Sequence, residues 1–451
     1  MSLIGRELTF RRDLIIKESM TLIHPFQSVV LNAAEDLLFA IVKNEVVVFR
    51  RSEGSEGYTL AGRWVDELAK DPPRATSEEA SDSKKSKGND GTPNASKGKG
   101  QPSVEIVPTN LLRAMTLSPD ESKLLVCADS DKSVCVLQID LDKKELNLIK
   151  RQAFPKRPNA IAALEDGSQI VVADKFGDAY QIPMVEETKG KAGKELQPLI
   201  GHVSMLTDVL FGKDDQGKKY LITSDRDEHI RVTHYPQTFI IDKWLFGHRE
   251  FVSSIHIPSW SSQLLFSAGG DDTIFLWDWM KGFKLSTFEY KDLIKPYLTD
   301  AHLAASRFQN ENNDLIEFAV AQITTCRKFP YAAFFVEATK ALIILHVDQT
   351  NAALSLKQVI DLRYNVISLS QVSDGFLITQ DNHESGNKEF VSLVRYIESK
   401  DTFELDNQFG ETLDEAINKS LSEDSTVNVQ PADIAQLYGV ANLKKHGEQY
   451  S

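Results

Sequence analysis

Clustered carboxylates are the side chains of this sequence that could perform chemistry. The segment 224–231, SDRDEHIR, gathers Asp225, Asp227 and Glu228 around Arg226, and the string AGGDD presents a second carboxylate pair further on. Carboxylates at such spacing could bind a metal ion or transfer protons. Both strings also read as turns between strands, where one aspartate orders the turn and the others face solvent.

The motifs that would support catalysis are absent from the sequence. It contains no HExxH, no GxSxG and no GxxxxGK[ST] pattern. Its glycine pairs, in AGGDD and KGKG, do not follow a strand and open a helix, so they form no dinucleotide-binding fingerprint. The sequence therefore predicts a non-enzymatic chain, with no catalytic residue, no metal site and no cofactor site of its own.

The composition of the chain limits the kinds of molecule that it could bind and the compartment in which it works. The 451 residues include 51 Lys and Arg against 65 Asp and Glu, a net charge of −14. This acidity argues against a stand-alone nucleic-acid binder, because phosphate affinity comes from Lys and Arg. No apolar run is long enough for a membrane-spanning helix, and three cysteines without a CxxC pair indicate a reducing, intracellular setting.

A repeat organises the middle of the chain. Four β-rich segments have their turns at Asp131, Phe176, Asp227 and Asp271, which lie 45, 51 and 44 residues apart. Gly-His pairs precede the last two segments at an interval of 46 residues, and the last segment ends in Trp-Asp. This period and these dipeptides are the signature of WD repeats, in which each repeat forms one four-stranded propeller blade.

Resemblance to other WD repeats also implies a network of polar side chains inside one blade. A hydrogen-bonded set would be formed by His248, Ser267, Asp271 and Trp277. Such a set stabilises a blade only when every member is satisfied. The preceding repeat keeps His202 and Ser224, with Asp227 at its turn, but lacks the tryptophan.

Three fainter repeats flank the four clear ones, so we predict an all-β, seven-bladed WD-repeat β-propeller over residues 20–440. Residues 1–19 form an N-terminal extension that we do not assign, and residues 441–451 form a short C-terminal tail. Residues 66–104, rich in Pro, Ser, Gly and Lys, predict a long disordered insertion between the first two blades. The string ETLDEAINKSLSED has the spacing of a helix.

Several strings recur together in one family. They include RPNAI, ADKFGD, GHVSMLTDV, SDRDEHI, RFQNENND, FFVEATK and KKHGEQYS. In this set the chain resembles the fungal non-catalytic WD-repeat subunit of the tRNA (guanine-N7-)-methyltransferase, from about residue 20 to the end. The resemblance implies a separate, Rossmann-type catalytic partner that binds S-adenosylmethionine and methylates a guanosine in the tRNA variable loop. It also implies a propeller that holds this partner active and helps position tRNA, in the nucleus with the cytoplasm as a second compartment.

Two adjacent charged turns predict where the partner docks. By the resemblance, the partner-binding residues are Lys175, Asp225, Arg226, Glu228 and Arg231. A mixed-charge surface suits a specific protein interface, since charge complementarity sets register. The alternative is that these groups are solvated turn charges of small energetic weight.

A second basic cluster, KRQAFPKRP, suggests contact with tRNA phosphates. Its members are Lys150, Arg151, Lys156 and Arg157. The alternative is an exposed loop between blades. Two other functions also stay open: a generic WD-repeat adaptor, such as a ubiquitin-ligase substrate receptor or a chromatin scaffold, and an enzyme with a site in the central channel.

Overall fold

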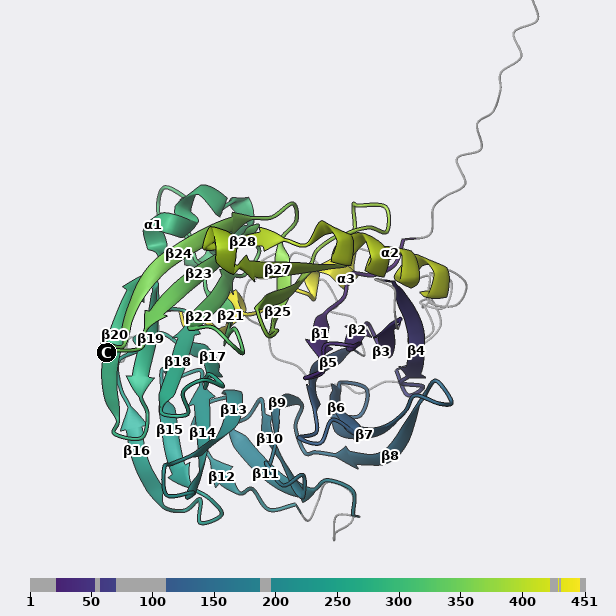
Figure 1. Ribbon diagram of the computed structural model, residues 1–451. Helices are drawn as coiled ribbons and strands as arrows, with labels where there is room; N and C mark the ends of the chain where they lie inside the picture. Colours follow the sequence, from purple (N-terminus) through teal and green to yellow (C-terminus); the bar gives the residue numbers. More distant parts are fainter. Residues whose placement is uncertain are drawn as a thin grey trace, which may run out of the picture.

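Seven antiparallel sheets, each made of four strands, form a closed ring in the computed structural model of the chain (Figure 1). The structure describes residues 22–52, 57–69, 111–186, 196–421, 429 and 431–446. The predicted extension 1–19, most of the predicted insertion 66–104 and the end of the predicted tail lie outside these residues. The predicted seven-bladed β-propeller is confirmed.

The first three blades occupy the N-terminal part of the ring. Blade 1 contains β1 (Ser28–Leu31), β2 (Leu37–Val42), β3 (Glu45–Arg51) and β4 (Tyr58–Val65). Blade 2 contains β5 (Leu112–Leu117), β6 (Lys123–Ala128), β7 (Ser133–Asp140) and β8 (Glu145–Ala153). Blade 3 contains β9 (Pro158–Ala163), β10 (Gln169–Asp174), β11 (Asp178–Pro183) and β12 (Ile200–Gly201). The predicted insertion thus falls between blades 1 and 2.

The other four blades complete the ring. Blade 4 contains β13 (Leu206–Lys213), β14 (Lys219–Asp225), β15 (Ile230–His234) and β16 (Ile241–Leu245). Blade 5 contains β17 (Val252–His256), β18 (Leu264–Gly269), β19 (Thr273–Asp278) and β20 (Phe283–Glu289). Blade 6 contains β21 (Val320–Thr325), β22 (Tyr331–Val336), β23 (Ala341–Asp348) and β24 (Ala353–Asp361). Blade 7 contains β25 (Val366–Gln371), β26 (Gly375–Gln380), β27 (Val391–Ile397) and β28 (Thr402–Leu405), with η4 (Glu398–Lys400) between its last two strands.

The hydrophobic core lies between neighbouring blades. All residues of the second strands β2, β18, β22 and β26 are buried, because each strand is covered on both faces. The outermost strand β20 is mostly exposed instead. This gradient explains why the second strand of each repeat reads as a continuous apolar run and the fourth strand as a weak, alternating pattern.

Among the described residues, hydroxyl and amide side chains on or next to the innermost strands donate hydrogen bonds across five of the seven junctions between neighbouring blades. The acceptors are backbone carbonyls, and the bonds run from Gln27 to Leu112, Asn159 to Leu206, Thr207 to Val252, Ser253 to Val320 and Ser370 to Val29. The last of these bonds joins blade 7 to blade 1. Polar residues in these strands are therefore structural, because buried carbonyls between blades need donors.

A helix seals the junction where the two ends of the ring meet. Helix α2 (Asn407–Leu421) follows the last strand and packs on β27 of blade 7 and β4 of blade 1 (Figure 1). Its buried side chains are Phe409, Leu413, Ala416, Ile417 and Leu421, one face of the helix. Among the described residues, no strand from the N-terminal part of the chain joins the sheet of blade 7. The apolar face of α2 instead packs against both blades and holds the two ends of the ring together.

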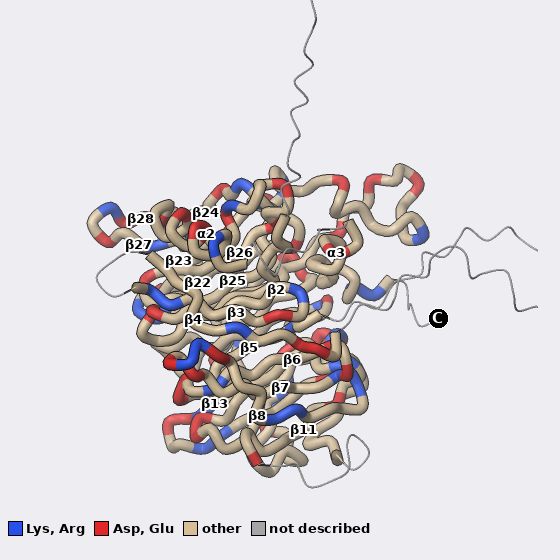
Figure 2. The backbone as a smooth tube through the Cα atoms, turned by 90° about the vertical axis from the view of Figure 1, so that its right-hand side faces the viewer, with Lys and Arg blue, Asp and Glu red and all other residues tan. Residues whose placement is uncertain are grey.

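Two further segments cover the side of the ring that carries the turns between the second and third strands of the blades, which we call the turn face. The link between blades 5 and 6 contains α1 (Lys291–Ile294), η1 (Lys295–Tyr297), η2 (Asp300–His302) and η3 (Ser306–Phe308). Residues 431–446, with α3 (Pro431–Ala435) and η5 (Ala441–Leu443), cross this face, and we call them the C-terminal strap. Figure 2 shows α3 at one side of the ring.

The strap is held from both ends and in the middle. Asp433 forms an ion pair with Lys43 of blade 1 at 3.1 Å. The Glu337 carboxylate of blade 6 accepts hydrogen bonds from the backbone N–H groups of three consecutive strap residues, Gly439, Val440 and Ala441. The predicted propeller boundary at residue 440 and tail at 441 therefore fall inside one ordered segment, whereas the last strand ends at Leu405.

Candidate functional site

Blade 5 contains a continuous chain of side-chain hydrogen bonds. His248 Nδ1 lies 2.6 Å from Asp271 Oδ2, and His248 Nε2 lies 2.7 Å from Ser267 Oγ. Trp277 Nε1 donates to the same Ser267 oxygen at 2.8 Å. The sequence predicts these four residues as one set, and the structure brings them together. Burial lowers the pKa of His248, against the opposing effect of Asp271, so the ring is neutral at pH 7.

Blade 4 contains a shorter set built on the same plan. His202 Nδ1 lies 2.8 Å from Asp225 Oδ2, and His202 Nε2 lies 2.9 Å from Thr223 Oγ1. Asp225 Oδ1 also accepts hydrogen bonds from the backbone N–H groups of Asp227 and His229 at 2.8 and 3.0 Å. The buried Asp225 carboxylate therefore orders the whole β14–β15 turn.

These contacts correct three predicted roles. Asp225 is buried and structural, so it is not an exposed partner-binding group, and it fills the place predicted for Asp227. Asp227 instead forms an ion pair with Lys445 of the strap. Thr223 replaces Ser224 as the partner of the histidine, because successive side chains of a strand point to opposite faces.

Arg231 occupies an unusual position in blade 4. It pairs across the sheet with Thr223 and Trp244, the place that Phe275 fills in blade 5. Its Nη1 donates to Gly201 O at 3.0 Å, and its guanidinium carbon lies 5.6 Å from the centre of the Trp244 ring. Burial lowers the pKa of the guanidinium, and the buried Nε has no hydrogen-bond partner. Arg231 thus carries an unused donor in a desolvated site.

Exposed aromatic rings lie beside Arg231 at the edge of blade 4. Trp244 on β16 stacks with Phe246 at 6.1 Å between ring centres and 15° between planes. The His229 ring contacts both at 5.4 and 6.4 Å. Phe246 is 68% exposed. Large apolar rings in this state mark a surface that another molecule covers.

The apolar surface continues onto blade 3. Phe176 at the β10–β11 turn is 57% exposed, and Val203 in the next loop is fully exposed. Gly177, with φ of 104°, brings this turn against the loop, since a Cβ there would lie 2.6 Å from the carbonyl oxygens of His202 and Ser204. The two exposed side chains are therefore carried by touching segments.

Two lysines flank the ring of Phe176. Lys156 Nζ lies 4.0 Å and Lys175 Nζ 5.7 Å from the ring centre. Neither lysine forms an ion pair with a carboxylate among the residues that the structure describes. We define the blade 3–4 surface as Lys156, Lys175, Phe176, Val203, Arg231, Trp244 and Phe246.

The predicted basic cluster of residues 150–157 does not form one patch. Lys150 is buried, and its ammonium donates to Pro183 O and Glu186 O at 2.5 and 2.7 Å. The Arg151 guanidinium is bound by two carboxylates, those of Asp66 and Asp131. Neither charge is therefore left free for tRNA phosphates, which argues against the predicted contact, because β8 turns both side chains toward neighbouring protein groups.

Arg157, the last member of the predicted cluster, is partly buried. Its Nε is 4.0 Å from Asp129, which also binds Arg113 at 2.7 Å. Burial and the neighbouring Arg113 lower the pKa of Arg157. Two guanidinium groups thus share one carboxylate, which leaves an excess of positive charge beside Lys156.

The remaining predicted partner-binding residues separate in the structure. Glu228 is exposed at the tip of its turn, with φ of 61°. Arg226 is not free, because its Nε donates to Leu443 O of the strap at 2.7 Å. The strap therefore uses one of the cations that the sequence predicts as an anchor for a partner.

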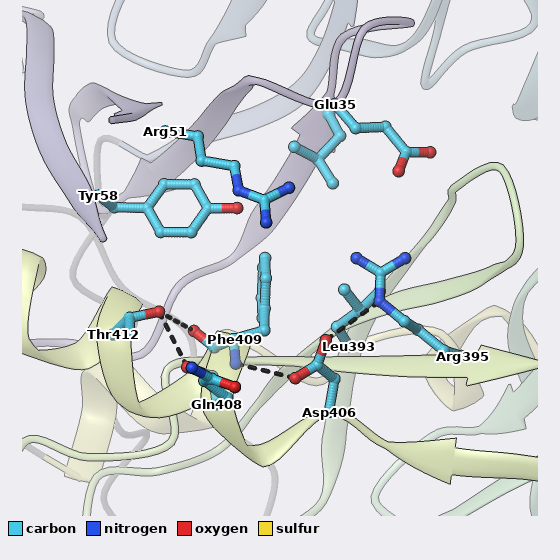
Figure 3. Close-up of a pocket in the computed structure, with 10 residues that line it drawn as sticks. Glu35, Arg51, Tyr58, Leu393, Arg395, Asp406, Gln408, Phe409 and Thr412 are labelled. Carbon is cyan, nitrogen blue, oxygen red and sulfur yellow. Dashed lines mark hydrogen bonds and ion pairs between the residues drawn. The ribbon is translucent and has the colours of Figure 1, made fainter. Parts of the chain in front are cut away.

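Other cavities and clusters do not suggest catalysis. A cavity of about 60 Å³ at the junction of blades 7 and 1 is lined by Arg51, Tyr58, Arg395 and Phe409 (Figure 3). It is far smaller than a typical ligand site, and Arg395 is held there by Asp406 at 3.1 Å. Among the described residues no cluster of His, Cys, Asp and Glu could hold a metal ion, and no helix is long and apolar enough to cross a membrane.

Comparison with known proteins identifies the family. The profile of the tRNA methyltransferase TRM82 WD40 domain matches residues 38–198 and 186–395. The chain belongs to the TRM82 WD40 family. The protein named tRNA (guanine-N(7)-)-methyltransferase non-catalytic subunit TRM82 of Vanderwaltozyma polyspora is 45% identical, over 96% of this chain and 100% of that protein. The protein of the same name from Kluyveromyces lactis is 46% identical, over 95% and 100%.

Solved structures extend the likeness in fold. The structure of U3-55K has a TM-score of 0.52 and 14% identity over 80% of this chain and 89% of that one. A chain of the mitotic checkpoint complex has a TM-score of 0.51 and 13% identity over 89% and 98%. At this identity the likeness shows the propeller fold alone.

Within this TRM82 WD40 propeller, sequence reasoning missed the aromatic part of the blade 3–4 surface. Trp244 and Phe246 stand in the string KWLFGH, where any aromatic residue reads as core. A weak signal was present, because the strand that ends before a Gly-His pair is the outermost strand of its blade, and apolar residues there have no neighbouring strand to cover them.

Proposed function

We propose that the chain is the non-catalytic subunit of a tRNA (guanine-N7-)-methyltransferase and that it holds a separate catalytic subunit in its active form. The observation that carries the proposal is the full-length match to proteins named as that subunit. A ring whose blade 5 is locked by a continuous chain of side-chain hydrogen bonds supports a scaffold role. S-adenosylmethionine would be bound by the catalytic subunit, which we expect to have a Rossmann-type fold.

The blade 3–4 surface is the proposed docking site for the catalytic subunit. It combines exposed aromatic rings with a polar rim, the composition that distinguishes interface centres from the rest of a protein surface. Arg231 supplies the specific element, since its buried Nε lacks a partner that a carboxylate of the catalytic subunit would provide. A desolvated, bidentate arginine pair of this kind is typical of binding hot spots.

The charges around this surface indicate which charged side chains the catalytic subunit should place against it. Within the described part of the chain Lys156 and Lys175 have no carboxylate partner, and Glu228 is an exposed acidic group on the neighbouring turn. We therefore expect acidic side chains of the catalytic subunit to face the blade 3 turn and a basic side chain to face Glu228. Complementary charges of this kind fix the register of two subunits.

Contact with tRNA and residence in the nucleus are further parts of the proposal. Lys156, which belongs to the blade 3–4 surface, and Arg157, next to it in sequence, are the members of the predicted tRNA cluster that stay near the surface. If the catalytic subunit covers them, they act in protein binding instead. Charge reversal of both residues distinguishes these roles, because loss of tRNA affinity in an intact complex indicates RNA contact and loss of the complex indicates protein contact.

Reconstitution tests the function directly. The purified chain, a purified catalytic subunit and a tRNA transcript would be combined, and guanine-N7 methylation measured for each subunit alone and for the pair. We expect the pair to exceed the catalytic subunit alone by at least about tenfold, or about 1.4 kcal/mol of barrier. Full activity of the catalytic subunit alone, or methylation by this chain alone, would contradict the proposal.

A further inference from the structure

A second cavity lies where the C-terminal strap crosses blades 4 and 5. It has a volume of about 520 Å³, within the range of small-molecule and nucleotide sites. Its walls come from three segments: the β14–β15 turn, the link between blades 5 and 6, and the strap. The side chains that give it chemical character are Arg226, Arg307, Phe308, Lys444, Lys445 and His446.

The cavity is basic in a chain whose net charge is strongly negative. Three carboxylates beside the cavity are engaged by strap side chains: Glu317 by His446, Glu250 by Lys444 and Asp227 by Lys445. Arg226 and Arg307 have no carboxylate within ion-pair distance among the described residues. Arg226 donates to carbonyl oxygens of the strap, so the guanidinium of Arg307 is the group best placed to meet an anion.

Flat surfaces accompany these charges. The His446 ring stacks on Phe308 with 3.6 Å between ring centres and 6° between planes. The exposed guanidinium of Arg307 lies 4.4 Å from the centre of the same Phe308 ring. A planar cation over a stacked aromatic pair is a platform for an unstacked base, and the neighbouring lysines suit phosphates.

The geometry points to a contact site for the RNA substrate: we propose that this cavity binds the phosphate backbone and an exposed base of the tRNA held by the catalytic subunit. The inference rests on the proposed function. The cavity begins at Arg226, in the same turn as Glu228, and this turn leads into the strand that carries Arg231 of the blade 3–4 surface, so RNA bound by a catalytic subunit docked there reaches it without crossing the ring. The strap thus builds a substrate-positioning site.

Arg307 gives the sharpest test, because it is exposed and does not hold the strap. In the complete heterodimer, Arg307→Glu should raise the KM for tRNA by about threefold to tenfold with unchanged kcat. It should also reduce the slope of log affinity against log salt by about 1, the loss of one phosphate contact. Lys328→Glu is the matched control, since Lys328 is an exposed lysine in the β21–β22 turn on the opposite side of the ring.

The outcomes separate the possibilities. An unchanged KM and salt slope for the Arg307→Glu heterodimer would overturn the proposal. Loss of the heterodimer in this variant would also overturn it, because the cavity would then belong to the protein interface. If the wild-type pair failed to methylate tRNA, the proposed function itself would fail, and direct tRNA binding by the wild-type and variant pairs would still decide whether the cavity contacts RNA.

Discussion

Blades 4 and 5 are neighbours with the same four-stranded plan, yet they differ in how they use one position. In blade 5, Trp277 on the third strand is buried and donates to Ser267, which completes the chain of hydrogen bonds to His248. In blade 4, Thr233 fills the place of this tryptophan and donates to a backbone carbonyl. The tryptophan of blade 4 is Trp244, which lies one strand further out and is partly buried.

This difference suggests that blade 5 serves mainly the stability of the fold and blade 4 the binding of a partner. In blade 5 the hydrogen-bonded set typical of WD repeats locks the sheet, and no donor of that set remains unpaired. Blade 4 keeps only the histidine, threonine and aspartate, and places Arg231 and two aromatic rings where another protein can contact them. A repeat that departs from the WD pattern is thus the repeat that contributes most of the proposed docking surface.

The largest expected effect comes from removing the two tryptophans in turn. Trp277→Ala should lower the free energy of unfolding by about 3–5 kcal/mol, because it leaves a cavity and removes one of the two side-chain hydrogen bonds of Ser267. Trp244→Ala should cost less than about 1 kcal/mol of stability but weaken binding of the catalytic subunit by about 2 kcal/mol or more. Urea unfolding and titration calorimetry measure the two quantities. Equal loss of stability in both variants would erase the distinction between the blades.

A smaller effect distinguishes the two aspartates of the blade 4 turn. Asp225→Ala removes the acceptor of His202 and of two backbone N–H groups, so we expect a loss of about 2–4 kcal/mol in unfolding free energy. Asp227→Ala removes a partly exposed ion pair and should cost less than about 1 kcal/mol. Thermal melting of the two variants side by side checks the ranking. The reverse order would restore Asp227 as the structural aspartate.

The pH dependence of stability should reflect the buried histidines of both blades. Burial lowers the pKa of His248 and of His202, so each ring stays neutral in the fold below pH 6.5 while the unfolded chain takes up the proton. Stability should therefore fall as pH drops from about 6.5 toward 5, by up to about 1.4 kcal/mol per pH unit for each ring. Unfolding of the wild type and of His248→Gln at several pH values measures this slope. A variant slope as steep as that of the wild type would mean that His248 does not contribute.

Lys175 should give the smallest effect. It is exposed and rests loosely against Phe176, so Lys175→Ala should leave stability unchanged and cost about 0–1 kcal/mol of binding free energy for the catalytic subunit. The effect should shrink as salt rises, because exposed charges are screened. Binding measured at low and high salt tests this. A large, salt-independent loss would place Lys175 in the desolvated centre of the interface.

The ring could be predicted from the sequence because its signals are local. Turn aspartates, Gly-His pairs and buried second strands recur at the interval of one blade, and each blade is made of four consecutive strands. The closing helix showed its apolar face in the spacing from Phe409 to Leu421. The course of the strap could not be predicted, since its contacts with Lys43, Glu337 and Glu317 join residues more than a hundred positions apart.

The candidate site was only partly predictable for the same reason. Charged residues could be located in turns, but whether each is free depends on distant groups: Lys150 meets the carbonyls after β11, and Arg226 meets the strap. Arg231 lies in a strand, so its exposure depends on the neighbour supplied by β16. A charged residue in the sequence therefore predicts a turn more reliably than it predicts that its side chain is free to bind a partner.

The native mass of mixed subunits tests the docking claim most directly. Wild-type chain and Lys328→Glu chain, each mixed with the catalytic subunit, should give the mass of a heterodimer. Arg231→Glu, which places a negative charge in the desolvated site, should give two separate masses while circular dichroism stays that of a folded propeller. A heterodimer mass for the Arg231→Glu chain at the same concentration and salt would contradict the assignment of the blade 3–4 surface as the docking site.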